Sequence, residues 1–185
     1  MKTRMVRDLM VPLQEYATVN EEASLYAAVL ALEEAQKTFH QNRYKHRAIL
    51  VLDESRRVVG KISQLDVLKG LEAGYKKMGD FKGISHTGFS TEFIKSMVDK
   101  YDLWKKPLEE ICRRSPHIKV KDIMYTPTEG EYVPMDATLD QALHQLVVGH
   151  HQSLLVTKGG REIVGILRLT DVFQEISDMI KVCNL

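Results

Sequence analysis

The stretch Val59-Gly60-Lys61-Ile62-Ser63-Gln64-Leu65-Asp66-Val67 decides the fold, because a second version of it occurs further along the chain. The second version is Val164-Gly165-Ile166-Leu167-Arg168-Leu169-Thr170-Asp171-Val172, with the glycine and the aspartate at the same spacing. Each version begins with apolar residues typical of a strand, and its aspartate falls where a helix is expected to begin. The chain is therefore predicted to contain two copies of one structural unit.

Working outward from these stretches, further landmarks repeat in the same order. Each copy opens with an Asp-Leu-Met or Asp-Ile-Met segment, and each has a hydroxyl residue, Ser24 or Thr138, suited to cap a helix. A short apolar run then predicts a buried strand. The order in each copy is strand, helix, strand, strand, helix. The paired landmarks are Val6–Met10 with Val120–Met124, Ala23–Leu25 with Ala137–Leu139, and Ala48–Leu52 with Leu154–Val156.

One copy of about 60 residues would bury only a marginal core. Two copies are therefore expected to pack sheet to sheet about a pseudo-twofold axis, giving an α+β fold of the α/β type. The space between such copies is the default place for a ligand.

The connector between the copies departs from this simple plan. It spans 45 residues, from Gly74 to Ile118, and we expect it to form a helical insert between copies at 1–73 and 119–185. Ser90 should cap a helix whose apolar stripe includes Phe93 and Met97. Such a stripe faces either the core or a partner. Trp104 is likewise either a contact residue or part of the core.

The composition excludes several classes of protein. The 185 residues carry 26 Lys and Arg against 25 Asp and Glu, which argues against a strong nucleic-acid binder. No apolar run approaches the roughly 20 residues of a transmembrane helix. Cys112 and Cys183 stand far apart, as expected for unpaired thiols in a reducing cytoplasm.

The repeated motifs resemble those of a tandem pair of CBS domains, also called a Bateman module. The resemblance lies in the Asp-x-Met openings, the Ala-Ser/Thr-Leu helix starts and the closing Gly-x-x-Ser-x-x-Asp, which is complete at Gly60, Ser63 and Asp66. In the second copy Arg168 replaces the serine, although Thr170 offers a hydroxyl that other members also use. The resemblance implies a regulatory module that binds AMP, ADP, ATP or S-adenosylmethionine and needs no other cofactor.

The resemblance implies two quasi-equivalent ligand sites between the copies. In site one, Ser63 and Asp66 would meet the ribose, with the base near Tyr132 and Val133 of the other copy. In site two, Thr170 and Asp171 would do the same, with the base near Tyr16 and Ala17. The residues expected near the phosphates are His46 and Arg47 in the first copy and His151 in the second.

The role of Arg168 stays open at this stage. Its side chain could fill site two, hold a phosphate chain, or neutralise Asp171 in an ion pair. Site one is therefore predicted to be the better preserved site.

Alternative functions are weaker. A ligand-free dimerisation or assembly module with a degenerate cleft is the main alternative. An enzyme is not expected, since the sequence has no P-loop, GxSxG or HExxH motif, and no metal site is expected. The resemblance implies a homodimer formed through the CBS helices. No transporter, kinase or synthase segment is recognisable, so any output would pass through an unidentified regulated partner or through self-association.

Overall fold

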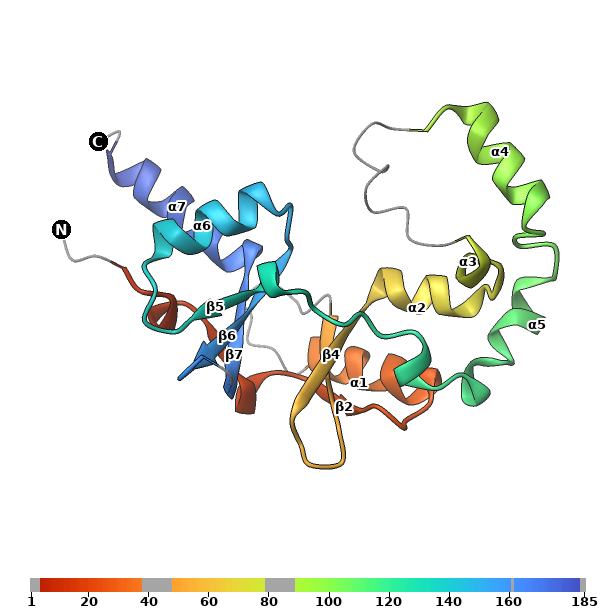
Figure 1. The fold of residues 1–185 in the computed structure, drawn as a ribbon, viewed down its shortest axis with the longest axis horizontal. Helices are drawn as coiled ribbons and strands as arrows, with labels where there is room; N and C mark the ends of the chain where they lie inside the picture. Colours follow the sequence, from red (N-terminus) through yellow and green to blue (C-terminus); the bar gives the residue numbers. More distant parts are fainter. Residues whose placement is uncertain (1–3, 38–47, 79–88, 161, 184–185) are drawn as a thin grey trace.

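The computed structural model describes residues 4–37, 48–78, 89–160 and 162–183. The elements alternate as the repeat predicts, and the α+β fold with two sheets is confirmed (Figure 1). The strands are β1 (Val11–Pro12), β2 (Thr18–Asn20), β3 (Ala48–Leu52), β4 (Val58–Ser63), β5 (Tyr132–Pro134), β6 (Ser153–Lys158) and β7 (Glu162–Arg168). The helices are α1 (Leu25–Lys37), α2 (Gln64–Leu71), α3 (Gly74–Lys77), α4 (Thr91–Lys100), α5 (Leu108–Cys112), α6 (Leu139–Val148) and α7 (Leu169–Cys183).

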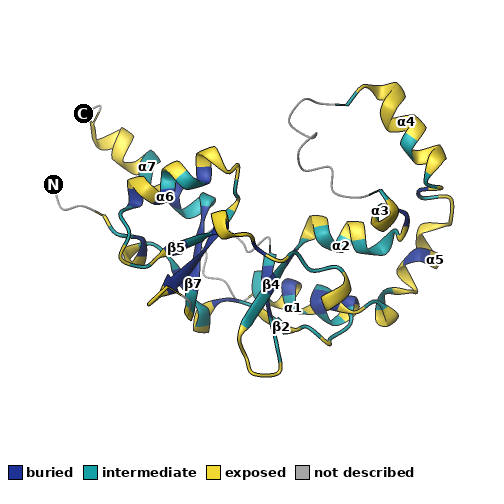
Figure 2. Cartoon of the chain, in the orientation of Figure 1, coloured by how far each residue is buried: buried dark blue, intermediate teal, exposed yellow. Residues whose placement is uncertain are grey.

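The two sheets are built alike. One has the order β2-β3-β4 and the other β1-β7-β6-β5. In both, a parallel pair is followed by an antiparallel hairpin, and the hairpin register shifts at equivalent points, after Val51 and after Val156. The apolar runs that predicted the central strands are buried on both faces of these sheets (Figure 2).

The opening segment of each copy lies in the other copy. Val6 is buried in the core formed by α6, β5, β6 and β7, and its amide donates to the carbonyl of Ala137 at 2.9 Å. Val120 is buried in the core formed by α1 and the first sheet, and its amide donates to Ala23 at 2.9 Å. The two halves are therefore interlocked as well as packed together.

The two motif glycines make this exchange possible. At Gly165, which pairs with β1, a Cβ would lie 2.5 Å from the carbonyl oxygen of Val11. At Gly60 it would lie 2.8 Å from the Met124 sulfur and 3.0 Å from the Tyr125 carbonyl oxygen. Real Cβ atoms do not come within 2.5 Å of a backbone oxygen, so Gly165 admits the exchanged segment of the opposite copy, and Gly60 leaves room for the equivalent close contact with Met124 and Tyr125.

The sheets face one another across a third, smaller core. Leu50 of β3, Leu155 of β6 and Ile166 of β7 are buried there together with Val11 and Tyr16. This layer fixes the distance between the two copies and therefore the geometry of any site between them.

The insert extends away from this body. Its first part forms the short helix α3, and the side chain of Ser90 caps α4, as predicted, by accepting from the Phe93 amide at 3.1 Å. The apolar stripe of α4 does not face the core, because no residue of this helix is buried (Figure 2).

Candidate functional site

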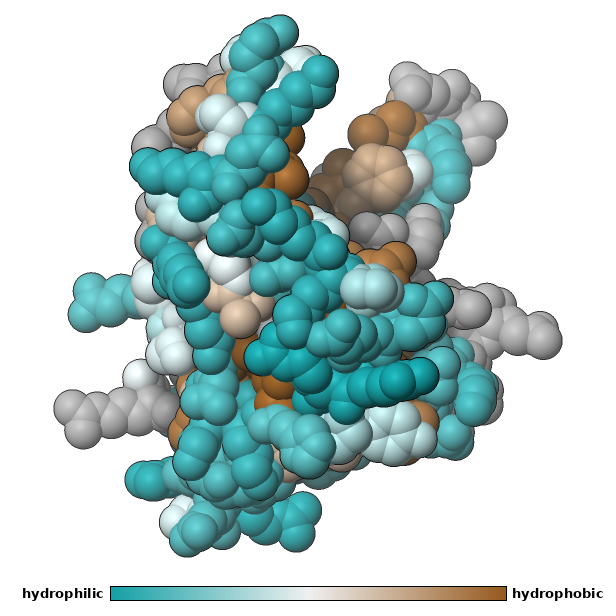
Figure 3. Space-filling model, turned by 90° about the vertical axis from the view of Figure 1, so that its right-hand side faces the viewer, coloured by the Kyte–Doolittle hydropathy of each residue, from teal (hydrophilic) through white to brown (hydrophobic). Residues whose placement is uncertain are grey.

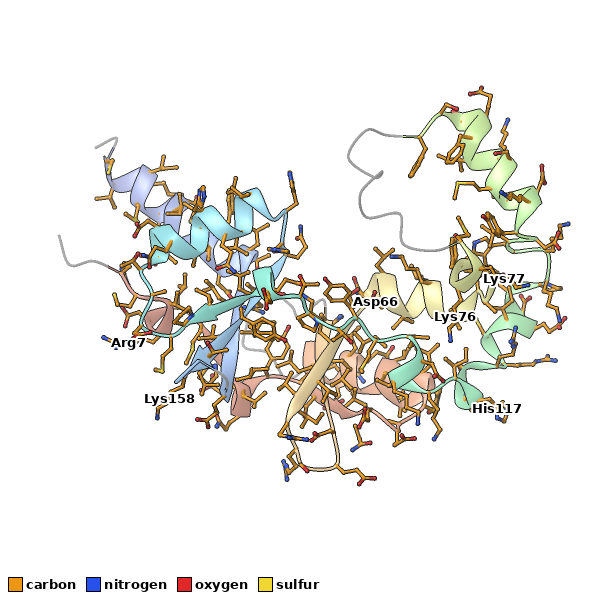
Figure 4. All side chains as sticks on the ribbon, in the orientation of Figure 1. Arg7, Asp66, Lys76, Lys77, His117 and Lys158 are labelled. Atoms are coloured by element: carbon orange, nitrogen blue, oxygen red, sulfur yellow. The ribbon has the colours of Figure 1, made fainter. Side chains whose placement is uncertain are left out.

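Asp66 lies at the start of α2, in the middle of the molecule (Figure 4). Ser63 ends strand β4 and is the N-cap of α2, so the local sequence places the two side chains next to each other. The Ser63 hydroxyl accepts from the Asp66 amide at 3.2 Å, and Asp66 Oδ2 accepts from the Ser63 amide at 2.8 Å. This reciprocal capping box holds the carboxylate in one orientation.

Only one oxygen of the Asp66 carboxylate is used in this way. Oδ2 also accepts from the Ser63 hydroxyl at 2.6 Å. For Oδ1, no partner is found among the residues that the structure describes. An acceptor held in place at a helix N-terminus is a suitable receptor for a sugar hydroxyl.

The equivalent aspartate of the second copy is fully engaged. Arg168 donates to Asp171 through Nε and Nη2, each at 2.5 Å from one carboxylate oxygen. Both side chains are nearly buried, at 6% and 11% exposed. Of the three roles left open for Arg168, the structure shows the ion pair with Asp171. This bidentate geometry is a strong form of the interaction.

Tyr16, predicted for site two, lies near enough to this pair for the charges of Arg168 and Asp171 to act on its hydroxyl, but it is buried. Its hydroxyl donates to the carbonyl of Ala48 at 3.0 Å. Burial raises the pKa of Tyr16 to about 12, against a smaller lowering by the Arg168 charge. The phenol therefore stays neutral and acts as part of the inter-sheet core.

The other predicted site residues lie at different depths. Val133 packs its side chain in the core of the second half, so only its backbone can meet a ligand, while Tyr132, Ala17 and Thr170 are partly exposed. His46 and Arg47 lie outside the described residues.

The structure also reveals a buried polar cluster that the sequence analysis missed. Glu131, only 3% exposed, accepts from Lys61 Nζ at 2.7 Å, from the Tyr125 hydroxyl at 2.5 Å and from the Thr128 amide at 3.1 Å. His151 Nδ1 lies 3.9 Å from the same carboxylate. Lys61 belongs to β4, two residues before Ser63, so the cluster joins the first half to the loop that enters β5. The sequence feature that could have indicated this cluster is Lys61, a charged residue within the apolar run that predicts strand β4.

The charge of Glu131 is favoured despite its burial. Burial alone raises the pKa of this carboxyl, but the hydrogen bonds from Lys61 and Tyr125 outweigh it and hold the pKa below its usual range. A carboxyl with a lowered folded-state pKa contributes stability above its unfolded-state pKa of about 4.3, and this contribution is lost as pH falls through the folded-state value.

We therefore expect the stability difference between the wild type and Glu131→Gln to depend on pH. The difference should be constant above about pH 5 and should shrink below about pH 4, where the unfolded carboxyl is protonated. Urea unfolding followed by circular dichroism at a series of pH values measures it. A difference that stays constant down to pH 3 would contradict a lowered pKa.

The comparisons with known proteins agree with the two-copy geometry. A family model for the CBS domain matches residues 6–73 and 120–178. The chain belongs to the CBS-domain family. The CBS matches leave the insert unmatched, and a comparison with curated proteins gives no match.

Solved structures show the same fold. A CBS domain-containing protein of unknown function from Bacillus anthracis is 18% identical, with a TM-score of 0.61, and the match covers 94% of this chain and 93% of that one. CBSX2 in complex with AMP is 19% identical, with a TM-score of 0.59 and coverage of 95% and 98%. The CBS domain of a bacterial CNNM/CorC family Mg²⁺ transporter in complex with ATP is 18% identical, with a TM-score of 0.58 and coverage of 94% and 87%.

Among the residues that the structure describes, no group of three or more His, Cys, Asp or Glu side chains could hold a metal ion. Of the helices that the structure describes, none has the length and apolar character needed to cross a membrane.

Proposed function

We propose that this CBS pair is a regulatory module that binds an adenosyl ligand, AMP, ADP, ATP or S-adenosylmethionine, at site one. The observation that carries the proposal is the Asp66 carboxylate. Ser63 holds its Oδ2, while Oδ1 has no partner among the described residues. Oδ1 can accept a hydrogen bond from a ribose hydroxyl without first losing another partner.

Site two is less suited to the same role. Both oxygens of Asp171 accept from Arg168, and a ribose would have to break this ion pair. Breaking one side of a nearly buried pair leaves an uncompensated charge. We therefore assign ligand binding to site one and a structural role to the Arg168–Asp171 pair.

The positive electrostatic potential at the start of α2 would attract the phosphates of a nucleotide. The first amides of a helix point outward and its dipole favours negative charge. His46 and Arg47, predicted from the sequence, and His151, beside Glu131, are the proposed basic contacts. The AMP and ATP complexes among the similar structures support an adenine nucleotide as ligand class.

The output of the module would go through self-association or through a regulated partner. All the large apolar side chains that are exposed in the described part of the chain lie on helices. Leu68 of α2 and Phe173 of α7 occupy equivalent positions and are 54% and 63% exposed. Matching apolar positions on the two copies favour a homodimer, in which ligand binding can act as a switch only if it favours one arrangement over another.

The same exposed helices support a second candidate, a ligand-free assembly module. The Arg168–Asp171 pair and the Lys61–Glu131 pair both join polar groups that a ligand would otherwise use. In such a module no nucleotide would bind between the copies, and the arrangement of the two copies would not change.

We also propose a cytoplasmic location. Cys112 and Cys183 are both unpaired and exposed, which suits a compartment that keeps thiols reduced.

A ligand screen separates the two candidates. At 100 times its dissociation constant, a ligand that binds only the folded state adds about 2.7 kcal/mol, which raises the melting temperature of a chain of this size by about 5–11 °C. Thermal unfolding with AMP, ADP, ATP and S-adenosylmethionine should show such a shift for one of them, with GTP as the control. No shift with any adenosyl ligand at millimolar concentration would favour the assembly module.

A further inference from the structure

The insert is attached to α2 at more than one point along the chain. It follows the C-terminal end of α2 directly, because α3 begins at Gly74. Its middle returns to Glu72, which accepts from the Gly74 amide at 2.9 Å and from the Trp104 amide at 3.0 Å. The segment just beyond it places Ile123 so close to α2 that a Cβ at Gly70 would lie 2.8 Å from the Ile123 Cγ2. The insert therefore leaves α2, touches its end and returns to its side (Figure 1).

The contact between Glu72 and Trp104 is reinforced by the residues around it. The Trp104 indole donates to the Tyr75 hydroxyl at 3.0 Å, and the two rings meet edge to face with their centroids 6.1 Å apart. Leu103 is 4% exposed and lies against Gly74, where a Cβ would be 2.5 Å from its Cδ2. The surface on the side of the molecule that carries the insert is mostly hydrophilic (Figure 3), so this apolar contact lies beneath polar residues. We call Glu72, Gly74, Tyr75, Leu103 and Trp104 the insert base.

The backbone of the insert base is held in an unfavourable conformation. Asp102 and Trp104 have φ angles of 54° and 56°, in the left-handed region. This region costs free energy for residues other than glycine and is rare for bulky side chains such as tryptophan. Such a conformation persists where neighbouring contacts enforce it, and here Glu72 holds the Trp104 amide while Leu103 is buried. The insert base can therefore exist in two states, closed as described and open with this backbone relaxed.

The helix that leads into the insert is also the helix with the available aspartate. Asp66 lies in the first turn of α2 and Glu72 is its C-cap, so the two carboxylates mark the ends of a helix of eight residues, about 12 Å long. In the second copy, the aspartate at the start of α7 is already paired with Arg168. Site one and the insert base thus share one short, rigid element.

We infer that α2 couples site one to the insert base, so that an adenosyl ligand bound at Asp66 favours the closed base. The structure shows the Asp66 receptor and the Glu72 contact formed together on the same helix. A ligand that binds α2 in this arrangement also stabilises the closed state at its other end. By linkage, opening the base must weaken ligand binding by the same factor.

This inference rests on the site-one binding proposed above and identifies the insert as the element that changes state with the ligand. The insert lies outside both CBS matches, so the coupling is a property of this chain.

Amide hydrogen exchange followed by NMR tests the coupling on the unmodified chain. AMP, ADP, ATP and S-adenosylmethionine are the probes, and isothermal titration calorimetry first shows which of them binds. At saturation, this compound should slow exchange of the Trp104 amide, which donates to Glu72, by at least about 5-fold. The reference is the Phe93 amide, which donates to Ser90 at the start of α4 and should exchange at an unchanged rate.

A pair of variants tests the effect in the other direction. Glu72→Ala removes both hydrogen bonds that close the insert base and should weaken ligand binding by about 5-fold or more, measured by calorimetry. For a nucleotide, the loss of a negative charge would by itself favour binding, so a loss of affinity cannot come from direct electrostatics. Glu109→Ala, the control, removes an exposed carboxylate from α5 in the same insert and should leave the affinity unchanged. The emission of Trp104, the only tryptophan of the chain, shows whether each variant opens the base.

The measurements separate failure of the coupling from failure of site one. If calorimetry detects no binding of any of the four compounds, site one is wrong and the coupling falls with it. Binding without a change in Trp104 exchange would overturn the coupling alone, as would an unchanged affinity of Glu72→Ala with its base open. Trp104 emission in Glu72→Ala that matches the wild type would show that Glu72 does not close the base, and the coupling would likewise be wrong.

Discussion

Replacing Glu131 with alanine should lower the free energy of unfolding by about 3–5 kcal/mol. The substitution leaves the Lys61 ammonium, whose side chain is only 15% exposed, without its ion-pair partner. It also removes the acceptor for the Tyr125 hydroxyl and the Thr128 amide. Guanidinium unfolding followed by circular dichroism measures the loss.

Two further variants serve as controls for the Glu131→Ala result. Glu129→Ala removes an exposed carboxylate from the same short helical turn and should change stability by less than about 0.5 kcal/mol. Glu131→Leu combined with Lys61→Met replaces the ion pair by apolar side chains and should recover the part of the loss that comes from the unpaired Lys61 ammonium. If Glu131→Ala is no more harmful than Glu129→Ala, the cluster does not stabilise the contact between the copies.

Replacing Asp66 with asparagine should weaken adenosyl-ligand binding by about 10- to 100-fold, since a hydrogen bond to a charged acceptor contributes about 1.5–3 kcal/mol. Isothermal titration calorimetry measures the affinity. Asp140→Asn is the matched control, because it also removes a carboxylate from the first turn of a helix, α6, and should leave the affinity unchanged.

The ligand provides an independent check on the same contact. A 2′-deoxy analogue should bind the wild type more weakly but should lose little further affinity on the Asp66→Asn protein, because the partner of the missing hydroxyl is already weakened. Equal losses on both proteins would show that Asp66 does not contact the ribose. Unchanged affinity of Asp66→Asn for the parent ligand would exclude site one as proposed.

Much of the fold could be predicted because its signals are local. Ser90 and Thr138 lie beside the helices that they cap, and the apolar runs of β3 and β6 carry their own indication of burial. The Ser63–Asp66 arrangement is local too, since its hydrogen bonds join residues three apart. The repeat then predicted that the order strand, helix, strand, strand, helix occurs in both copies.

The tertiary structure alone decided which residues meet across the two copies. Val6 enters the second half and Val120 the first, and Lys61 reaches Glu131 across 70 positions. Such pairings depend on how two sheets pack and on which side chains are then removed from water, and neither is written in a local pattern.

The same reason accounts for the two sites and for the insert. The sequence by itself determined two aspartates at equivalent positions and an amphipathic helix between the copies. Arg168 and Asp171 are also only three residues apart, so their ion pair was one of the roles that the sequence left open. The structure selects this role, in which Arg168 occupies both oxygens of Asp171, while Asp66 Oδ1 meets no partner among the described residues. Packing also decided that α4 would project from the body, because Leu103 and Trp104 anchor its base and no part of either core extends to its apolar face.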